Sequence, residues 1–199
     1  MTAINDRSSP IALLLSRHSG TARDMIAPGP DEAQLQRILA AAVSVPDHGR
    51  LMPWRFVIVP TDQRDGLADA FERIFMAEKE VARDAEREAV RNFARFAPTL
   101  VVVLHRPNPQ SRIPLPAQSA SAAAAAMTLS HAAHAEGFVC CWLTGWAAYS
   151  PQVTALFGEP DDNIVGFMFI GTPGRPLSRR DRPELAEVVS VWRATPEGG

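Results

Sequence analysis

The sequence lacks the short motifs by which many nucleotide-binding and hydrolytic enzymes are identified. It contains no G-x-G-x-x-G fingerprint, no G-x-x-x-x-G-K-[ST] loop and no G-x-S-x-G turn around a nucleophilic serine. These absences argue against a Rossmann dinucleotide site, a P-loop and an α/β-hydrolase.

Long apolar runs and cysteines are also scarce. No strictly apolar run exceeds six residues, whereas a transmembrane helix needs about 18 or more. The early run at residues 11–15 is followed by Arg17 and His18, where a secretory signal would place its cleavage site. The two cysteines, Cys140 and Cys141, are adjacent and cannot join distant segments. We therefore expect a soluble, cytoplasmic protein in a reducing compartment, without a membrane partner.

The charge balance excludes a general attraction to polyanions. Twenty basic residues stand against 22 acidic ones, which gives a net charge of −2, so a nucleic-acid partner is not expected. Apolar residues make up 46% and charged residues 21% of 199 residues. This composition predicts a single folded domain, residues 1–199, with a core that needs no disulfide or metal.

Helical and extended patterns alternate along the chain. Helices are expected to begin at Pro10 and Asp31 and to cover 62–96, 117–136 and 150–158, with strands at 54–59, 99–105, 138–143 and 164–170. From Glu78 to Arg91, nine of fourteen residues are charged, and we expect this part to be solvated or packed along a partner subunit. The order predicts an α+β fold with α/β-like alternation, in which helices flank a small central mixed sheet.

Several residue groups offer candidate chemistry, each with a plainer alternative. Arg17-His18-Ser19 presents donors suited to a phosphate or ribityl chain, or is a basic helix end placed favourably in the helix dipole. The loop 46–48, which leads to Pro53 and Trp54, suits a binding loop or ordinary packing. The arginines near the C-terminal end form a phosphate clamp or a solvated turn; they are Arg179, Arg180 and Arg182.

Two further pairs favour the plainer alternative. His131 and His134 are spaced to lie near each other on a helix, but no third ligand is spaced to complete a metal site. Cys140 and Cys141 are explained equally well as small apolar strand residues and as a redox pair. We therefore predict no metal site.

Taken in order, these features resemble the FMN-dependent nitroreductase family, and a short branch of NAD(P)H nitroreductases in particular. The resemblance rests on five elements in sequence over residues 8–192. They are Arg17-His18-Ser19, the segment 35–54 ending in P-D-H-G-R-L-M-P-W, Gly137-Phe138 leading to W-L-T-G, the I-V-G-F to G-T-P element at 164–173, and R-D-R-P at 180–183.

The resemblance implies a nitroreductase-like fold and a domain-shared homodimer, with two FMN sites at the subunit interface. The alanine-rich segment 117–136 would lie at the dimer core, because small side chains permit close helix approach. The implied FMN-binding residues of one chain are Arg17, His18, Ser19, Trp142, Leu143, Thr144, Arg180 and Arg182, with Ser44 and His48 contributed by the partner.

The resemblance also implies a ping-pong mechanism. NADH or NADPH delivers a hydride to FMN and leaves, and a nitroaromatic or quinone-like acceptor then takes its place. Because the flavin carries the chemistry, no catalytic side chain is predicted. The alternatives are a flavin-binding or carrier protein without turnover, and a relative with other flavin chemistry, such as reductive dehalogenation or flavin fragmentation.

Overall fold

A five-stranded sheet organises the molecule. The computed structural model describes residues 3–193. The strands are β1 (Met25–Ile26), β2 (Trp54–Val59), β3 (Thr99–His105), β4 (Val139–Leu143) and β5 (Asn163–Pro173). The long β5 lies at the centre, because it pairs with β1, β3 and β4, while β2 pairs with β3. Every one of these pairings is antiparallel, so the α+β class is confirmed but the expected mixed sheet is wrong.

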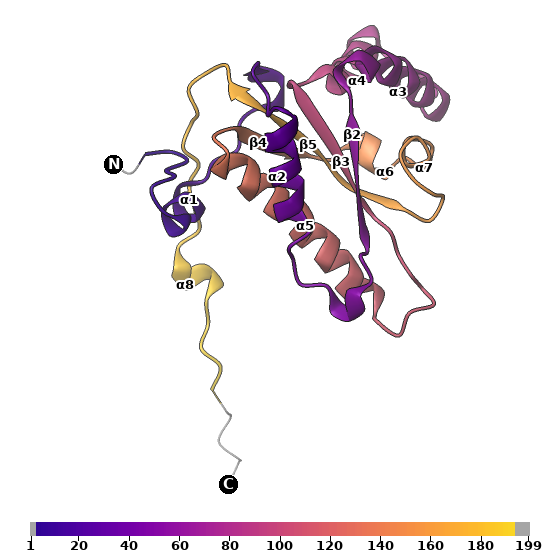
Figure 1. Cartoon of the computed structure of the whole chain (residues 1–199). Coiled ribbons are helices and arrows are strands. Elements are labelled where there is room, and N and C mark those ends of the chain that lie inside the picture. The colour runs from indigo at the N-terminus through magenta and orange to yellow at the C-terminus, as the bar shows by residue number, and fades with distance from the viewer. Residues whose placement is uncertain (1–2, 194–199) are drawn as a thin grey trace.

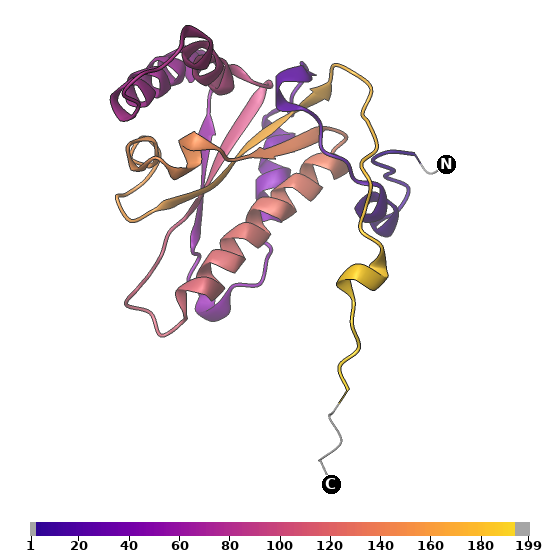
Figure 2. The ribbon, with the colours of Figure 1, turned by 180° about the vertical axis from the view of Figure 1, so that it is seen from behind.

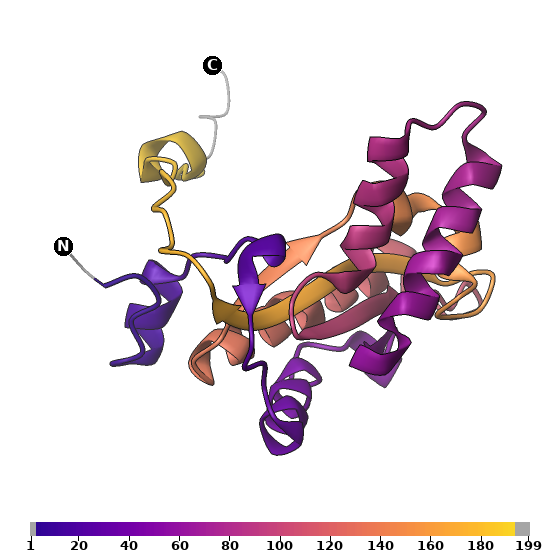
Figure 3. The same cartoon turned by 90° about the horizontal axis from the view of Figure 1, so that it is seen from above.

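Helices cover both faces of the sheet (Figure 1, Figure 3). One face carries α2 (Glu32–Ala42) and α5 (Leu115–Ala135), and the other carries α3 (Arg64–Glu78) and α4 (Asp84–Arg95). Leu100 to Leu104 in β3 are fully buried between these layers, as the unbroken apolar run predicts for a strand covered on both faces. The shorter elements are α1 (Pro10–Ser16), η1 (Ala22–Asp24), η2 (His48–Arg50), η3 (Thr61–Gln63), α6 (Trp146–Tyr149), α7 (Pro151–Thr154) and α8 (Leu185–Val188).

The first two helices begin where the sequence predicts. The Ser9 side chain accepts a hydrogen bond from the Ala12 N–H at 3.1 Å, ahead of α1. At α2, the Gln34 N–H donates to the Asp31 carboxylate at 2.7 Å, while the Asp31 N–H donates to the Gln34 side chain at 3.0 Å. This reciprocal capping box satisfies two otherwise unpaired N–H groups at the start of α2.

The segment between β2 and β3 differs from the expectation. The predicted single helix over 62–96 is wrong, because the chain reverses between Glu78 and Asp84 and forms the α3–α4 hairpin (Figure 3). A hairpin returns the chain to the end of the sheet that it left, so β3 runs antiparallel to β2, whereas a single crossover helix gives parallel strands.

Ion pairs join the two helices of this hairpin. Arg87 and Arg91 of the charged run 78–91 pair with carboxylates of α3, and the sequence interpretation missed this pairing within one chain. The pairs, with their nitrogen–oxygen distances, are Arg87–Glu72 at 2.6 Å, Arg91–Glu72 at 2.5 Å, Arg91–Asp69 at 2.7 Å and Arg95–Asp65 at 2.7 Å. Lys79, the only lysine in the sequence, pairs with Glu86 at 2.6 Å near the tip.

Arg64 fastens the base of the hairpin to the sheet. Its buried guanidinium donates from Nε to the Val59 carbonyl and from Nη1 to the Ala94 carbonyl, each at 3.0 Å. Burial lowers the Arg64 pKa to about 10, so the side chain is still a cation at neutral pH. One residue thus joins the end of β2 to the last turn of α4 and holds α4 over the sheet.

The two ends of the described chain carry apolar side chains without cover. After β5 the chain leaves the body, and α8 projects away from it (Figure 1, Figure 2). Leu185 and Trp192 in this arm are 75% and 84% exposed, and Leu15 of α1 is 75% exposed. Within residues 3–193, no helix has the length and apolar character needed to span a bilayer.

Candidate functional site

An unpaired strand edge forms the backbone of the candidate site. Within the described residues, β4 pairs with β5 alone, so its other edge presents unpaired N–H and C=O groups. From Val139 to Thr144 this edge extends for about 17 Å. Residues 17–22 lie at its start, because Gly20 contacts Val139 and the Cys141 thiol lies beside the Ala22 backbone. Thr144 and the turn into α6 lie at its end.

Two arginines meet at the start of the β4 edge. Arg17 donates from Nη1 to the Ser19 hydroxyl at 3.1 Å, and Arg182 donates to the Arg17 carbonyl at 2.5 Å. Burial first, and then the positive charge of Arg182, lower the Arg17 pKa. Neither arginine has a carboxylate partner among residues 3–193. Close guanidinium groups without an acid are arranged to attract an anion.

A small polar cleft adjoins this pair. It has a volume of about 60 Å³ and lies between residues 19–25 and 173–180, with Ser19 and Arg180 both in its lining. That volume holds about two waters, which is the scale of a phosphate group and not of a whole mononucleotide. Arg175 and Asp24 also border the cleft, 3.8 Å apart. Arg175 is not among the residues predicted from the sequence to bind FMN, and the structure places it in the same cleft as Arg180.

His18 is buried beside these residues with one ring nitrogen unsatisfied. Its Nδ1 lies 2.7 Å from the Ser16 carbonyl, whereas its Nε2 is buried and has no partner among the described residues. If Nδ1 carries the proton, as a donor to a carbonyl must, Nε2 is a vacant acceptor. The backbone N–H of His18 donates to the Asn5 side chain at 2.7 Å, a support that no sequence pattern indicated.

His134 anchors this segment to α5. Its ring nitrogens lie 2.7 Å from the Ser130 carbonyl and 3.1 Å from the His18 carbonyl. Burial lowers the His134 pKa, so at neutral pH the ring is neutral and donates to only one of these carbonyls at a time. Within residues 3–193, no cluster of three or more His, Cys, Asp or Glu side chains is arranged to hold a metal ion.

The two cysteines belong to the sheet packing. Cys140 is fully buried, and burial raises its pKa to about 12. Burial also raises the pKa of Cys141. Both side chains are therefore protonated thiols at neutral pH, which favours the packing interpretation over a redox pair.

The residues predicted to line the isoalloxazine differ in orientation. The Trp142 indole donates from Nε1 to the Val165 carbonyl at 3.0 Å and lies against Gly166, where a Cβ would be 2.1 Å from Nε1. Trp142 packs with the α5 layer and Leu143 with the α3 layer. The side chains of Trp142 and Leu143 therefore extend to opposite faces of the sheet. What these two residues and Thr144 can offer together to one ligand is their backbone, along the unpaired edge of β4.

The turn after Thr144 is held in a defined conformation. Gly145 has φ +81° and ψ −164°, a combination that is essentially restricted to glycine. Glu78 at the end of α3 accepts a hydrogen bond from the Trp146 indole at 2.7 Å and another from the Ser150 hydroxyl at 2.5 Å. The Trp146 ring meets Phe75 edge-on, with centroids 4.9 Å apart.

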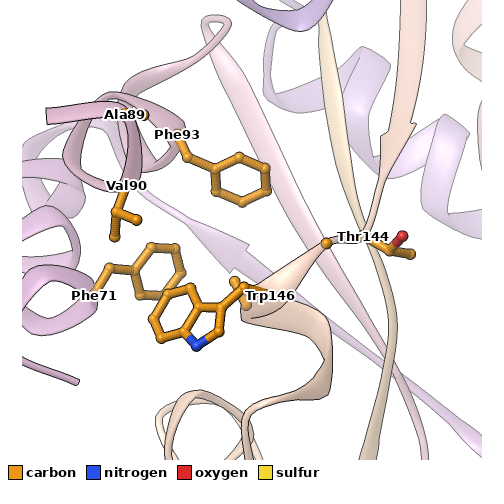
Figure 4. A pocket seen from close by; sticks show the side chains of 8 residues that line it. Phe71, Ala89, Val90, Phe93, Thr144 and Trp146 are labelled. Atoms are coloured by element: carbon orange, nitrogen blue, oxygen red, sulfur yellow. The ribbon is translucent and has the colours of Figure 1, made fainter. Parts of the chain in front are cut away.

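A pocket of about 230 Å³ opens beside this turn (Figure 4). We call it the aromatic pocket, and its lining consists of Phe71, Ala89, Val90, Phe93, Thr144, Gly145, Trp146 and Ala147. The rings of Phe71, Phe93 and Trp146 gather on one side, and the Thr144 hydroxyl is turned away from them (Figure 4). The sequence analysis missed this pocket, because α3, α4 and the β4–α6 turn all contribute to it.

Ser44 and His48 lie apart from the other predicted residues. Both are exposed, beyond the end of α2. His48 borders a shallow depression with Gln118 near the start of α5, whereas His134 near the end of α5 contacts residue 18. These two points are about 24 Å apart along the helix. A single chain therefore does not bring Ser44 or His48 to the start of the β4 edge.

Comparisons with known proteins agree with this fold. The profile of the nitroreductase family matches residues 26–172, a segment that begins within β1 and contains β2 to β4 and nearly all of β5, but not Arg17, Arg180 or Arg182. An Escherichia coli protein named "Putative NAD(P)H nitroreductase YdjA" is 33% identical over 164 residues, which cover 82% of this chain and 87% of that protein. A Haemophilus influenzae protein named "Putative NAD(P)H nitroreductase" is 29% identical over 174 residues, 86% of this chain and 92% of that protein.

Solved structures give the same result for the fold. A nitroreductase-like family protein from Bacillus cereus superposes with a TM-score of 0.81 and 21% identity, covering 96% of this chain and 100% of that one. A nitroreductase with bound FMN from Bacteroides fragilis superposes with a TM-score of 0.68 and 21% identity, covering 94% of this chain and 100% of that one. The predicted fold is thereby confirmed. With the sequence relatives and the matched profile, it shows that the chain belongs to the nitroreductase family.

Proposed function

We propose that the protein is an FMN-dependent NAD(P)H oxidoreductase that reduces nitroaromatic or quinone-like acceptors by a ping-pong mechanism. Membership of the nitroreductase family supports the flavin-dependent oxidoreductase class. The observation that carries the assignment is the cluster at the start of the β4 edge, where Arg17, Arg182 and Arg180 gather with Ser19 and no carboxylate neutralises Arg17 or Arg182 within residues 3–193. The cytoplasmic location expected from the sequence stays a prediction.

The residues present fit this cofactor. Arg17, Arg180 and Ser19 would hold the phosphate, because the cleft that Ser19 and Arg180 line has the size of one phosphate group and Arg17 contacts Ser19. The vacant Nε2 of His18 would accept a hydrogen bond from the bound mononucleotide or from a water that accompanies it. When bound, FMN supplies the two-electron redox chemistry. The unpaired edge of β4 then offers backbone groups to orient a flat ring, and Gly145 fixes the direction of the chain at the end of that edge.

We further propose that the working unit is a homodimer with shared sites. Three features support it: Ser44 and His48 are distant from Arg17 within one chain, α1 and the α8 arm expose apolar side chains, and α5 has small side chains on its outer face. A groove of about 510 Å³ between α1 and α5 has Leu13, Leu14 and His131 in its lining. A second copy would cover this groove and bring its own Ser44 and His48 toward the first copy's arginines.

Rapid-mixing spectroscopy tests the activity. The purified protein should be yellow, and anaerobic NADH or NADPH should bleach the flavin absorbance. A nitroarene or quinone should then restore it, with steady-state kinetics of the ping-pong type. Flavin that neither nicotinamide nucleotide reduces would contradict the oxidoreductase and favour a carrier. Reduced flavin that reacts with neither acceptor class would contradict the proposed substrates.

Subunit mixing tests the shared site. Arg17→Ala and His48→Ala should each weaken FMN binding. When the two variants are denatured together and refolded at equal amounts, half of the dimers are mixed and each mixed dimer has one intact site. About a quarter of the tight FMN sites should therefore return. Sites built from one chain would return none, and a monomer in sedimentation at full flavin occupancy would contradict the dimer directly.

A further inference from the structure

We propose that the aromatic pocket receives the ring system of an uncharged, flat acceptor, and that Ala89 limits the size of the ring that enters. This inference rests on the proposed function, since it names the acceptor class of the same site. It concerns a pocket formed within one chain, by α3, α4 and the β4–α6 turn. The reaction served is the two-electron reduction of a quinone to a hydroquinone, for which NAD(P)H supplies the hydride and solvent supplies one proton.

The volume of the pocket selects the ring size. A cavity of about 150 Å³ accepts a benzene molecule, and the aromatic pocket measures about 230 Å³. It is thus large enough for two fused rings and too small for a drug-sized polycyclic compound. Ala89, Gly145 and Ala147 supply this space, because each has a minimal side chain at the wall.

The lining of the pocket disfavours acceptors that carry a charge. Phe93 and Trp146 contribute aromatic surface and Val90 adds an aliphatic wall, while the fully buried Phe71 packs against both aromatic rings. None of the lining residues is ionisable, and the Thr144 hydroxyl faces away from the rings (Figure 4). A sulfonate or carboxylate on the acceptor would therefore be desolvated without a cationic partner, at a cost that uncharged rings avoid.

Packing and a hydrogen bond hold the walls of the pocket in place, so that the pocket can discriminate between acceptor rings of different size. Phe71 is fully buried and makes edge contacts with Trp146, Phe157 and Phe167 at centroid distances of 6.0–6.4 Å. Trp146 is fixed from outside by its 2.7 Å hydrogen bond to Glu78. Ala89 is an exposed position of α4 at the opening, so a larger side chain there narrows the entrance without disturbing the core.

Filling the entrance tests the proposal. Ala89→Leu in the holoenzyme should raise the KM for 1,4-naphthoquinone at least tenfold. The rate of flavin bleaching by NAD(P)H, the FMN affinity and the reduction of ferricyanide, which needs no ring pocket, should be unchanged. Ala77→Leu, the same change at an exposed position of α3 outside the pocket, should alter none of these quantities. In the unmodified protein, 1,4-naphthoquinone-2-sulfonate should show a KM at least tenfold above that of the uncharged quinone.

A binding measurement separates this inference from the proposed function. Naphthoquinone should shift the Trp146 indole N–H resonance, assigned with Trp146→Phe, in the unmodified protein but not in Ala89→Leu. This readout needs neither flavin nor turnover, so it reports on the pocket even if the oxidoreductase proposal fails. The inference is overturned if naphthoquinone leaves the resonance unmoved, or if its KM is unchanged in Ala89→Leu. It is also overturned if that variant loses FMN affinity or flavin bleaching in parallel, because the pocket would then hold the cofactor or the nicotinamide.

Discussion

The two ends of the β4 edge differ in every physical property that matters for binding. At the start, Ser19 and Arg180 line a small polar cleft, and Arg17 donates a hydrogen bond to Ser19. At the other end, about 17 Å away, aromatic rings line an apolar pocket nearly four times as large. The difference teaches that anchoring an anion and selecting an apolar ring are separated along one strand, so substitutions at the two ends should affect different measurements.

The largest expected effect is at the start of the edge. Arg17→Ala or Arg180→Ala removes a charge-assisted contact with the FMN phosphate and should lower FMN affinity about ten- to a hundredfold, or about 1.5–3 kcal/mol. Riboflavin lacks the phosphate, so its weaker binding should hardly change. Titration of the apoprotein with both flavins measures the two affinities.

The control for this experiment must come from outside the cleft. Arg175 is unsuitable, because it borders the same cleft as Arg180. Arg55 on β2 is exposed and distant in the sheet from β4, and Arg55→Ala should change neither affinity. Equal losses for FMN and riboflavin in the Arg17 variant would show that it acts through folding, and would remove the phosphate contact from the argument.

The next effect concerns the backbone at the far end. Gly145→Ala forces a side chain into a conformation that costs about 1–3 kcal/mol, so the free energy of unfolding in urea should fall by that amount. Gly66 in α3 provides the matched control, since a Cβ there meets nothing within 4 Å. Gly66→Ala should raise stability by about 0.5–1 kcal/mol. If Gly145→Ala is neutral, the turn adapts and does not fix the pocket.

A smaller effect is expected from Glu78, which supports the same end. Glu78→Ala removes two hydrogen bonds and should cost about 1–2 kcal/mol of stability. Because Trp146 loses its external anchor, the KM for naphthoquinone should rise severalfold while FMN affinity stays unchanged. Glu78→Gln retains one acceptor oxygen and should recover part of the KM. A loss of FMN affinity in Glu78→Ala would show that the two ends are coupled.

The smallest effect is a decrease in the stability of the α3–α4 hairpin at acid pH. This hairpin contributes α3 and α4 to the aromatic pocket at the apolar end of the β4 edge. Hydrogen bonds from Lys79 and Arg83 lower the Glu86 pKa to about 2, and those from Arg91 and Arg87 lower the Glu72 pKa. A carboxyl group whose pKa is lower in the folded than in the unfolded state stabilises the fold at pH values above the unfolded pKa. This contribution is lost as the pH falls through the folded-state pKa. Hairpin stability should therefore decline between about pH 4.5 and 2. Glu86→Gln should flatten this decline in a helix-monitored acid titration, and an unchanged profile would exclude the Glu86 contribution.

Elements with local signals were predictable from the sequence. Ser9 predicts the start of α1, and Asp31 with Gln34 predicts the start of α2, because a helix cap is formed by residues that are neighbours in the sequence. The strand at 99–105 is evident from its apolar run, since a strand covered on both faces has no polar side. Arg17 with Ser19 was predictable as a pair for the same reason: two positions apart, they contact each other directly.

Features that depend on distant residues were not predictable. The chain reverses at 79–83 without a glycine or proline, and the ion pairs that favour the hairpin form only after α4 folds back on α3. Arg64 looked like an ordinary helix residue, although it bonds carbonyls of β2 and α4. The aromatic pocket likewise exists only where Phe71, Phe93 and Trp146 converge from three separate elements.

The position of Lys79 has a practical consequence for spectroscopy. Since it is the only lysine, a reagent specific for lysine amines attaches a single side-chain reporter at the tip of the α3–α4 hairpin, immediately after Glu78, which contacts Trp146. The pairing of its ammonium with Glu86 should slow acylation whenever the tip is closed. The labelling rate then reports how often the Lys79–Glu86 pair at the tip of the hairpin opens. It can be measured in the unmodified chain, without engineered attachment points.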